Sequence, residues 1–177
     1  MKRFALINAD PPWQFADRGS RIAPDFEGRH YKTKSLKEIL EVDGPMVWDL
    51  ARANAVLALW APNVFVADGT AKRVCQAWDF EPKQLVPWVK RSEAGKLQIG
   101  MGHYTRCCTE MLVLATRGRV KVQRHDIPGL IEAPRGRHSA KPDESYELLQ
   151  KLFKGPYLEL YARRQYNERW TVWGDQI

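Results

Sequence analysis

Apolar and polar residues form blocks along this chain that predict strands and helices in turn. Five apolar runs have the length and composition of buried strands, at residues 4–7, 55–60, 85–89, 108–116 and 157–162, and residues 171–173 suggest a short sixth. Strands that alternate with helices predict an α/β fold with a doubly wound, mostly parallel sheet. No repeat or linker divides the chain, so we expect a single domain over residues 1–177.

Helix signals lie between these strands. Ser35 is expected to cap a short helix, with Glu38 in the capping-box position. Asn63 could cap a longer helix that is weakened at Gly69. The longer helices are expected at residues 46–53, 63–78 and 142–153.

Polar, glycine-containing stretches predict two long loops, at residues 14–29 and 91–104, while residues 128–137 predict a loop or an edge segment. Long loops in a compact domain usually carry function, so the first is a candidate lid over a binding site. Pro87 predicts an irregularity in the third strand, because proline has no N–H to donate to a sheet.

The first strand ends in an Asp-Pro-Pro-Trp sequence at residues 10–13. Pro11 and Pro12 lack an N–H and cannot continue a central strand, so the chain must leave the sheet at Asp10. This places a carboxylate, a stiff turn and the ring of Trp13 at the carboxyl end of a strand. Ligands bind at that edge in open α/β sheets.

These residues suit methyl transfer to an amino group of a nucleobase, which is a poor nucleophile because its lone pair is delocalised into the ring. The Asp10 carboxylate and the Pro11 carbonyl could accept hydrogen bonds from its two N–H groups. This would free the nitrogen lone pair to attack a methyl group. Trp13 could stack on the base. The alternative is a strand that ends in a Pro-Pro turn with a core tryptophan.

Glu110 lies among the apolar residues of the fourth predicted strand. A buried carboxylate without a partner is costly, so Glu110 must pair with a basic group or face a site. A structural ion pair and a functional position are both open for this residue.

Composition restricts the class of protein. Its 44% hydrophobic and 28% charged residues are ordinary for a globular domain, and no apolar run is long enough for a transmembrane helix. Because Met1 to Arg3 lead straight into the first strand, no signal peptide is expected. The three cysteines form no disulfide framework and lack metal-binding spacing. We therefore expect a cytoplasmic protein without a metal.

The net charge of +7 suits a polyanionic partner. Basic residues crowd the stretch from Arg117 to Lys141, and we name residues 117–137 the basic segment. It is either a solvated loop face or a phosphate-contacting surface. The candidate nucleic-acid contacts are Arg124, Arg135 and Arg137.

The sequence at residues 10–13 resembles motif IV of the amino-methyltransferases, in the form found in the adenine/adenosine N6-methyltransferase family. This family includes the eukaryotic messenger-RNA N6-adenosine methyltransferase and many short bacterial and phage proteins. Similar motifs follow in the family's order over nearly the whole chain, at residues 30–33, 88–90, 102–104, 110, 141–144, 159–163 and 170–174.

The resemblance implies an S-adenosyl-L-methionine-dependent methyltransferase that acts on the N6 amino group of adenine in nucleic acid, with DNA favoured over RNA. It also implies a circularly permuted fold, with the catalytic half first and the cofactor half last. The implied substrate-binding residues are Tyr31, Trp88 and Glu110. The implied cofactor-binding residues are Asp10, Lys141, which would bind the methionine carboxylate, Arg163, Gln165, Asp175 and Gln176.

Two departures from the family pattern concern the cofactor. No G-x-G sequence follows Ala162, and residues 1–9 contain no acid that could bind the cofactor adenine. A homodimer or a partner subunit that completes the pocket is therefore an open alternative.

Two alternatives to adenine methylation follow from the same residues. One is methylation of cytosine N4 or of a protein glutamine, although related motifs there more often begin with Ser or Asn. The other is a catalytically silent methyltransferase-like module that binds nucleic acid or an active partner. The intact Asp10 favours activity.

Overall fold

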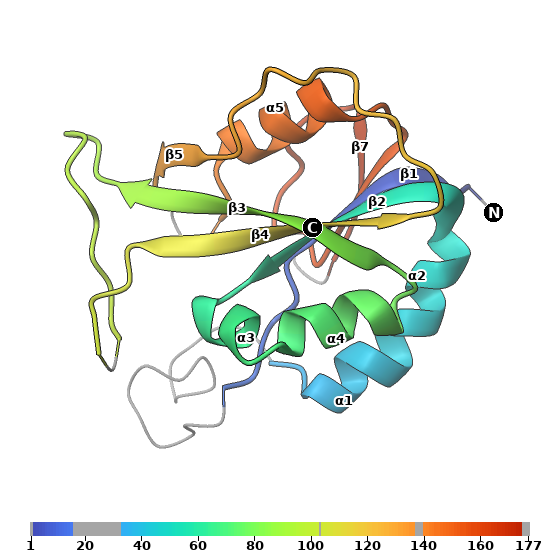
Figure 1. Cartoon of the computed structure of the whole chain (residues 1–177), viewed down its shortest axis with the longest axis horizontal. Helices are drawn as coiled ribbons and strands as arrows, with labels where there is room; N and C mark the ends of the chain where they lie inside the picture. Colours follow the sequence, from blue (N-terminus) through green and yellow to red (C-terminus); the bar gives the residue numbers. More distant parts are fainter. Residues whose placement is uncertain (1, 16–32, 103, 137–139, 175–177) are drawn as a thin grey trace.

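The computed structural model describes residues 2–15, 33–102, 104–136 and 140–174, and its centre is a seven-stranded sheet in the order β5-β3-β4-β2-β1-β6-β7 (Figure 1). The strands are β1 (Phe4–Ala9), β2 (Ala51–Ala61), β3 (Glu81–Arg91), β4 (Thr109–Arg117), β5 (Ile131–Pro134), β6 (Tyr157–Leu160) and β7 (Trp170–Trp173). Strand β4 is antiparallel to β2 and β3, and the other neighbouring pairs are parallel. The predicted α/β fold is confirmed.

Helices cover both faces of this sheet (Figure 1). One face carries a continuous helical stretch made of α1 (Leu36–Glu38), the π-helix η1 (Ile39–Asp43) and α2 (Gly44–Leu50), followed by α3 (Asn63–Ala67) and α4 (Thr70–Ala77). The other face carries α5 (Asp143–Leu152). Within the described part of the chain, no helix is long and apolar enough to cross a membrane.

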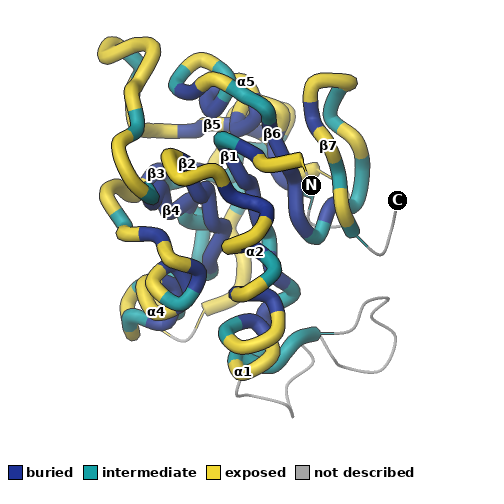
Figure 2. The backbone as a smooth tube through the Cα atoms, turned by 90° about the vertical axis from the view of Figure 1, so that its right-hand side faces the viewer, coloured by how far each residue is buried: buried dark blue, intermediate teal, exposed yellow. Residues whose placement is uncertain are grey.

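Two apolar cores lie between these layers, one on each face of the sheet. Alternate residues of β2 separate into them: Leu57 and Leu59 join the core under α1–α4, whereas Val56 and Trp60 join the core under α5. A strand buried on both faces has no polar side, which explains its continuous apolar run. Figure 2 shows the buried residues concentrated along these central strands.

The capping box predicted at Ser35 is confirmed. The Ser35 hydroxyl accepts from the Glu38 amide, and the Glu38 carboxylate accepts from the Ser35 amide at 2.8 Å. Both unpaired amides at this helix start are thus satisfied.

Two helix predictions need correction. The helix expected at residues 46–53 ends at Leu50, because Ala51 pairs with Phe4 and begins β2. The helix expected at residues 63–78 breaks into α3 and α4 at Gly69, which adopts φ 81°. Asn63 is not the cap, since Pro62 occupies that position and the Asn63 side chain bonds across to Thr109 at 3.0 Å.

The irregularity in β3 also lies elsewhere than predicted. Pro87 pairs in register with Met111, and the register shift lies between Pro82 and Gln84. The paired segment of β5 begins opposite Trp88, so Pro87 lies just before the part of β3 with a second neighbour. At that point the missing N–H is tolerated.

A buried acid lies in the core under α5. Glu159 on β6 is 7% exposed, and its Oε1 accepts a 2.7 Å hydrogen bond from the Tyr146 hydroxyl on α5. Its Oε2 has no hydrogen-bond partner among the described residues, and neither does Oδ1 of Asn8, which is in register with Glu159 on β1. Burial raises the pKa of Glu159 to about 7.

This pKa predicts a pH dependence of stability that Glu159→Gln should remove. Because the folded protein favours protonated Glu159, this group adds to the free energy of unfolding. The contribution is full below pH 4.5, the pKa of the group in the unfolded chain, and is lost as the pH rises through about 7, its pKa in the folded protein. The wild-type protein should lose up to roughly 3 kcal/mol from this group over that range. Denaturant unfolding of both proteins at several pH values measures it, and an equal loss in the variant would contradict the assignment.

Candidate active site

The Asp-Pro-Pro-Trp sequence forms a turn at the carboxyl end of β1, between β2 and β6, and we name residues 10–13 the motif turn. Parallel strands β1, β2, β3 and β6 end at the same edge of the sheet, where antiparallel β4 begins. A pocket of about 230 Å³ opens there. It is lined by Asp10, Pro11, Pro12, Trp13, Phe15, Pro62, Asn63, Lys90, Cys107, Thr109, Glu110, Lys141 and Arg163.

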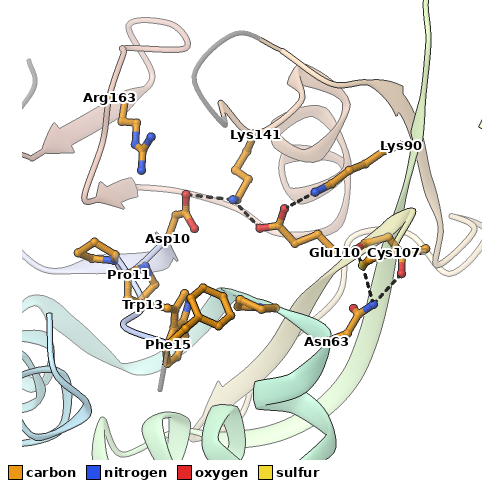
Figure 3. Close-up of a pocket in the computed structure, with 13 residues that line it drawn as sticks. Asp10, Pro11, Trp13, Phe15, Asn63, Lys90, Cys107, Glu110, Lys141 and Arg163 are labelled. Carbon is orange, nitrogen blue, oxygen red and sulfur yellow. Dashed lines mark hydrogen bonds and ion pairs between the residues drawn. The ribbon is translucent and has the colours of Figure 1, made fainter. Parts of the chain in front are cut away.

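Four charged side chains form a continuous chain of ion pairs along this pocket, which we name the ion chain (Figure 3). Lys141 Nζ lies 3.0 Å from Asp10 Oδ2 and 2.5 Å from Glu110 Oε1. Lys90 Nζ lies 3.0 Å from Glu110 Oε2. Lys141 also lies over the Trp60 ring, 5.3 Å from its centroid, which adds a cation–π contact to its support.

The two carboxylates of the ion chain differ in proton affinity. Burial raises the pKa of Asp10 above its usual value, the negative charge of Glu110 adds to the rise, and Lys141 opposes it. Burial alone would also raise the pKa of Glu110, but Lys141 and Lys90 outweigh it and lower the pKa to about 2. Glu110 is therefore a fixed negative charge, whereas Asp10 is the more basic of the two acceptors.

Lys141 keeps its proton despite burial. Burial alone would lower its pKa, but the charges of Asp10 and Glu110 raise the pKa above 10.5. The residue lies just before the Pro142 cap of α5, and its ammonium group is held by its ion pairs with Asp10 and Glu110.

The motif turn is held by its own backbone and by the core. The Trp13 amide donates to the Pro11 carbonyl at 2.8 Å, which leaves that oxygen one further lone pair. Trp13 is 6% exposed, and its Nε1 donates to the Trp60 carbonyl at 2.9 Å. Phe15 also lines the pocket and is stacked on Phe65 with ring centroids 5.2 Å apart.

A polar wall faces the motif turn across the pocket. Asn63 Nδ2 donates to Thr109 Oγ1 at 3.0 Å and to Cys107 Sγ at 3.4 Å, so the first residue of α3 is joined to the start of β4 and to the segment just before it (Figure 3). None of these three residues, nor Lys90, was predicted from the sequence to bind substrate or cofactor. Their assembly depends on the antiparallel pairing of β4 with both β2 and β3, which no local sequence signal reveals.

The structure brings four widely separated predicted residues into one pocket: Asp10, Glu110, Lys141 and Arg163. Arg163 reaches it from the turn after β6, and its guanidinium points toward Asp10 in Figure 3. Glu110 pairs with basic groups and also lines the pocket.

Other predicted residues lie away from the pocket lining or beyond the described structure. Trp88 is buried in the core under α5 and donates to the Ala133 carbonyl at 3.0 Å. Gln165 donates to the Trp170 carbonyl at 3.2 Å. The placements of Tyr31, Arg137, Asp175 and Gln176 lie outside the described residues, as does most of the loop expected at residues 14–29.

The basic segment runs from the end of β4 to β5 and passes over α5 (Figure 1). Gln123 anchors it there, because its backbone amide donates to the Leu152 carbonyl at 2.8 Å. Arg124 and Arg135 are exposed, and Arg124 pairs with Asp126 at 2.6 Å. Among the described residues, no group of three or more His, Cys, Asp or Glu side chains could hold a metal ion.

The donor set of the pocket fits a zwitterionic amino-acid group such as the methionine part of S-adenosylmethionine. Lys141 is a buried ammonium with three N–H donors, so besides Asp10 and Glu110 it can bind one further carboxylate, and the Asp10 carboxylate can accept from a cationic or N–H donor. Arg163 adds a second basic group at the same pocket.

The chain is similar to known proteins over almost its whole length. The sequence profile of the MT-A70 family matches residues 4–176. The chain is 26% identical to the Type II methyltransferase M.MunI of Mycoplasma sp. over 195 residues, which cover 99% of this chain and 78% of that protein. It is 24% identical to the N(6)-adenosine-methyltransferase MT-A70-like protein of Arabidopsis thaliana, covering 98% of this chain and 24% of the plant protein.

The profile match extends from β1 and its motif turn to the residues after β7, so it includes every strand and all four residues of the ion chain. The resemblance drawn from the sequence motifs is confirmed, and the chain belongs to the MT-A70 family.

Proposed function

We propose that this protein is an S-adenosylmethionine-dependent methyltransferase that methylates the N6 amino group of adenine in nucleic acid. The observation that carries this proposal is the position of Asp10, a carboxylate with a raised pKa at the carboxyl end of a central strand, in a pocket with Lys141 and Arg163. We favour DNA, since the chain spans most of the type II methyltransferase but about a quarter of the plant N(6)-adenosine-methyltransferases.

Asp10 would accept one N–H of the amino group, and the free lone pair of the Pro11 carbonyl would accept the other. Both acceptors draw the nitrogen out of conjugation, so that its lone pair can attack. Because Asp10 is negative, it also stabilises the positive charge that the nitrogen gains. In a duplex the target base would have to leave the stack to reach the pocket.

Lys141 and Arg163 would hold the cofactor, with Lys141 on its carboxylate. When bound, S-adenosylmethionine supplies a methyl group already activated on a sulfonium sulfur, so positioning provides most of the rate. Glu110 and Lys90 would keep Lys141 in place, because Glu110 is held between the two lysines. Trp13 would form a wall of the base pocket.

Replacing Asp10 by Asn should reduce methyl transfer by a factor on the order of 10² to 10³, the usual effect of removing one preorganised polar group from a reacting centre. The measurement is incorporation of labelled methyl from S-adenosylmethionine into DNA and RNA. Asp49→Asn is the control, because Asp49 is exposed on α2 and is not among the described residues that line the pocket. Near wild-type turnover in Asp10→Asn would remove the central claim.

Replacing Lys141 by Met should weaken cofactor binding and shift the pH profile. Loss of one charge-assisted bond to a carboxylate costs about 1.5–3 kcal/mol, and calorimetric titration measures it. Because Lys141 lowers the pKa of Asp10, its removal should move the acid limb of the activity profile to higher pH.

Lys90→Met is the control for this variant, since Lys90 pairs with Glu110 and not with Asp10. Its acid limb should stay near that of the wild type. An unchanged cofactor dissociation constant in Lys141→Met would restrict Lys141 to a structural ion pair.

The basic segment predicts a salt-dependent affinity for nucleic acid. Replacing Arg124, Arg135 and Arg137 together by Gln should reduce the slope of log affinity against log salt by up to about three units. The matched control removes three exposed charges from α1 and α4, at Lys37, Lys72 and Arg73, and should leave the slope unchanged. Equal slopes in the test variant and the wild type would show that the basic segment does not contact phosphates.

A further inference from the structure

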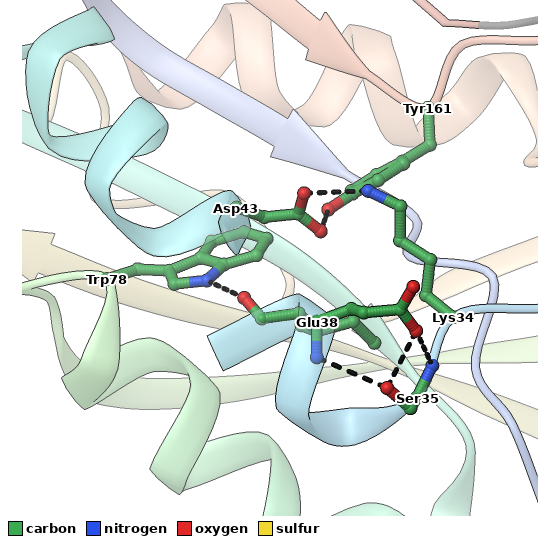
Figure 4. A network of polar contacts seen from close by, with 7 residues as sticks. Lys34, Ser35, Glu38, Asp43, Trp78 and Tyr161 are labelled. Atoms are coloured by element: carbon green, nitrogen blue, oxygen red, sulfur yellow. Dashed lines mark hydrogen bonds and ion pairs between the residues drawn. The ribbon is translucent and has the colours of Figure 1, made fainter. Parts of the chain in front are cut away.

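A second polar network lies on the face of the sheet that carries α1–α4 (Figure 4), where Tyr161 packs against the core. The ion chain lies on the other face, since Lys141 contacts Trp60 of the core under α5. Its centre is Asp43, whose side chain is 5% exposed. Asp43 Oδ1 lies 2.7 Å from Lys34 Nζ, and Oδ2 accepts a 2.5 Å hydrogen bond from the Tyr161 hydroxyl. Lys34 also lies 5.3 Å from the centroid of the Tyr161 ring, so the three residues contact one another pairwise.

Asp43 lies on a segment of unusual backbone conformation. It is the last residue of the π-helix η1, which interrupts the run from α1 to α2. The first carbonyl of η1, on Ile39, accepts a 2.8 Å hydrogen bond from Trp78 Nε1, so η1 is fixed to the end of α4. Single π-helical turns of this kind occur frequently at functional sites.

One end of this network holds the motif turn. The backbone amide of Lys34 donates to the Pro12 carbonyl at 2.8 Å, and Lys34 forms an isolated parallel bridge with Trp13. The segment that carries Lys34 is therefore attached to the motif turn by its backbone and to Asp43 by its side chain.

The other end holds the turn that carries Arg163. Tyr161 follows β6 directly and adopts φ 59°, a left-handed conformation that residues other than glycine rarely take. Such a conformation persists where its surroundings hold it. Position 161 is a tyrosine and not a glycine, which would adopt this conformation freely. The hydrogen bond from the Tyr161 hydroxyl to Asp43 is one contact that holds the residue in place.

Asp43 thus connects two segments that frame the pocket, although it is not among the described residues that line it. We propose that Asp43 is a positioning residue, which through Lys34 and Tyr161 holds the motif turn and the Arg163 turn at a fixed separation for the cofactor. The identity of that ligand rests on the proposed function; the mechanical connection between the two turns does not.

The primary test replaces Tyr161 by Phe, which removes the hydroxyl and keeps the ring. Tyr157→Phe is the matched control, because Tyr157 begins β6, the strand that Tyr161 follows, and its hydroxyl donates to the Phe153 carbonyl at 2.8 Å. Three quantities are measured for each: amide hydrogen exchange without cofactor, the dissociation constant for S-adenosylmethionine, and the melting temperature.

In Tyr161→Phe we expect several-fold faster amide exchange at residues 161–164 and at residues 33–35. The S-adenosylmethionine dissociation constant should rise roughly tenfold, the equivalent of one hydrogen bond. The melting temperature should fall by a similar amount in Tyr161→Phe and Tyr157→Phe. In Tyr157→Phe, however, amide exchange at both segments and the affinity for S-adenosylmethionine should be unchanged.

A variant of Asp43 tests whether the network acts as one unit. Asp43→Leu should reproduce the effects of Tyr161→Phe, and the double variant should be no weaker in cofactor binding than Asp43→Leu alone. Unchanged exchange at both segments in Tyr161→Phe, or additive losses of affinity, would overturn the proposal. If the wild-type protein bound no S-adenosylmethionine, the proposed function would fail, while the exchange measurement would still decide the role of Asp43.

Discussion

The ammonium group of Lys141, buried between the carboxylates of Asp10 and Glu110, is the interaction on which the pocket depends. Without that cation, two carboxylates would share a buried site, which is costly for any protein. Lys90 completes the chain, so two positive and two negative charges balance. The outcome is asymmetric, because Glu110 pairs with two lysines, whereas Lys141 is the lysine that pairs with Asp10. The acid at the motif turn therefore keeps acceptor capacity for a ligand.

The sheet brings this arrangement together from distant parts of the chain. Asp10 follows β1, Glu110 is the second residue of β4, and Lys141 precedes α5. Antiparallel β4 matters most, since its reversed direction places its first residues at the edge where the parallel strands end. Support for the motif turn comes from the opposite face, through Lys34 and Asp43. The pocket is thus held from both sides of the sheet.

Several of these features could be predicted from the sequence, for identifiable reasons. Two prolines after an apolar run fix the end of β1, and the Ser35 cap has a local signature. The pairing of Glu110 with Lys141 joins residues far apart in the sequence, so only the folded sheet reveals it. The π-helix at Asp43 and the left-handed Tyr161 escaped prediction because neither has a local signal; a glycine would have marked such a turn.

The central claim is the chemical identity of the methylated group, and nucleoside mass spectrometry measures it directly. Purified protein is incubated with S-adenosylmethionine carrying a labelled methyl group and with DNA and RNA in parallel, and the nucleic acids are then digested to nucleosides. Our account predicts label in N6-methylated adenine nucleosides, reduced by a factor on the order of 10² to 10³ when Asp10 is replaced by Asn. Label on cytosine or on protein, or adenine labelling at a near wild-type rate without the Asp10 carboxylate, would contradict it.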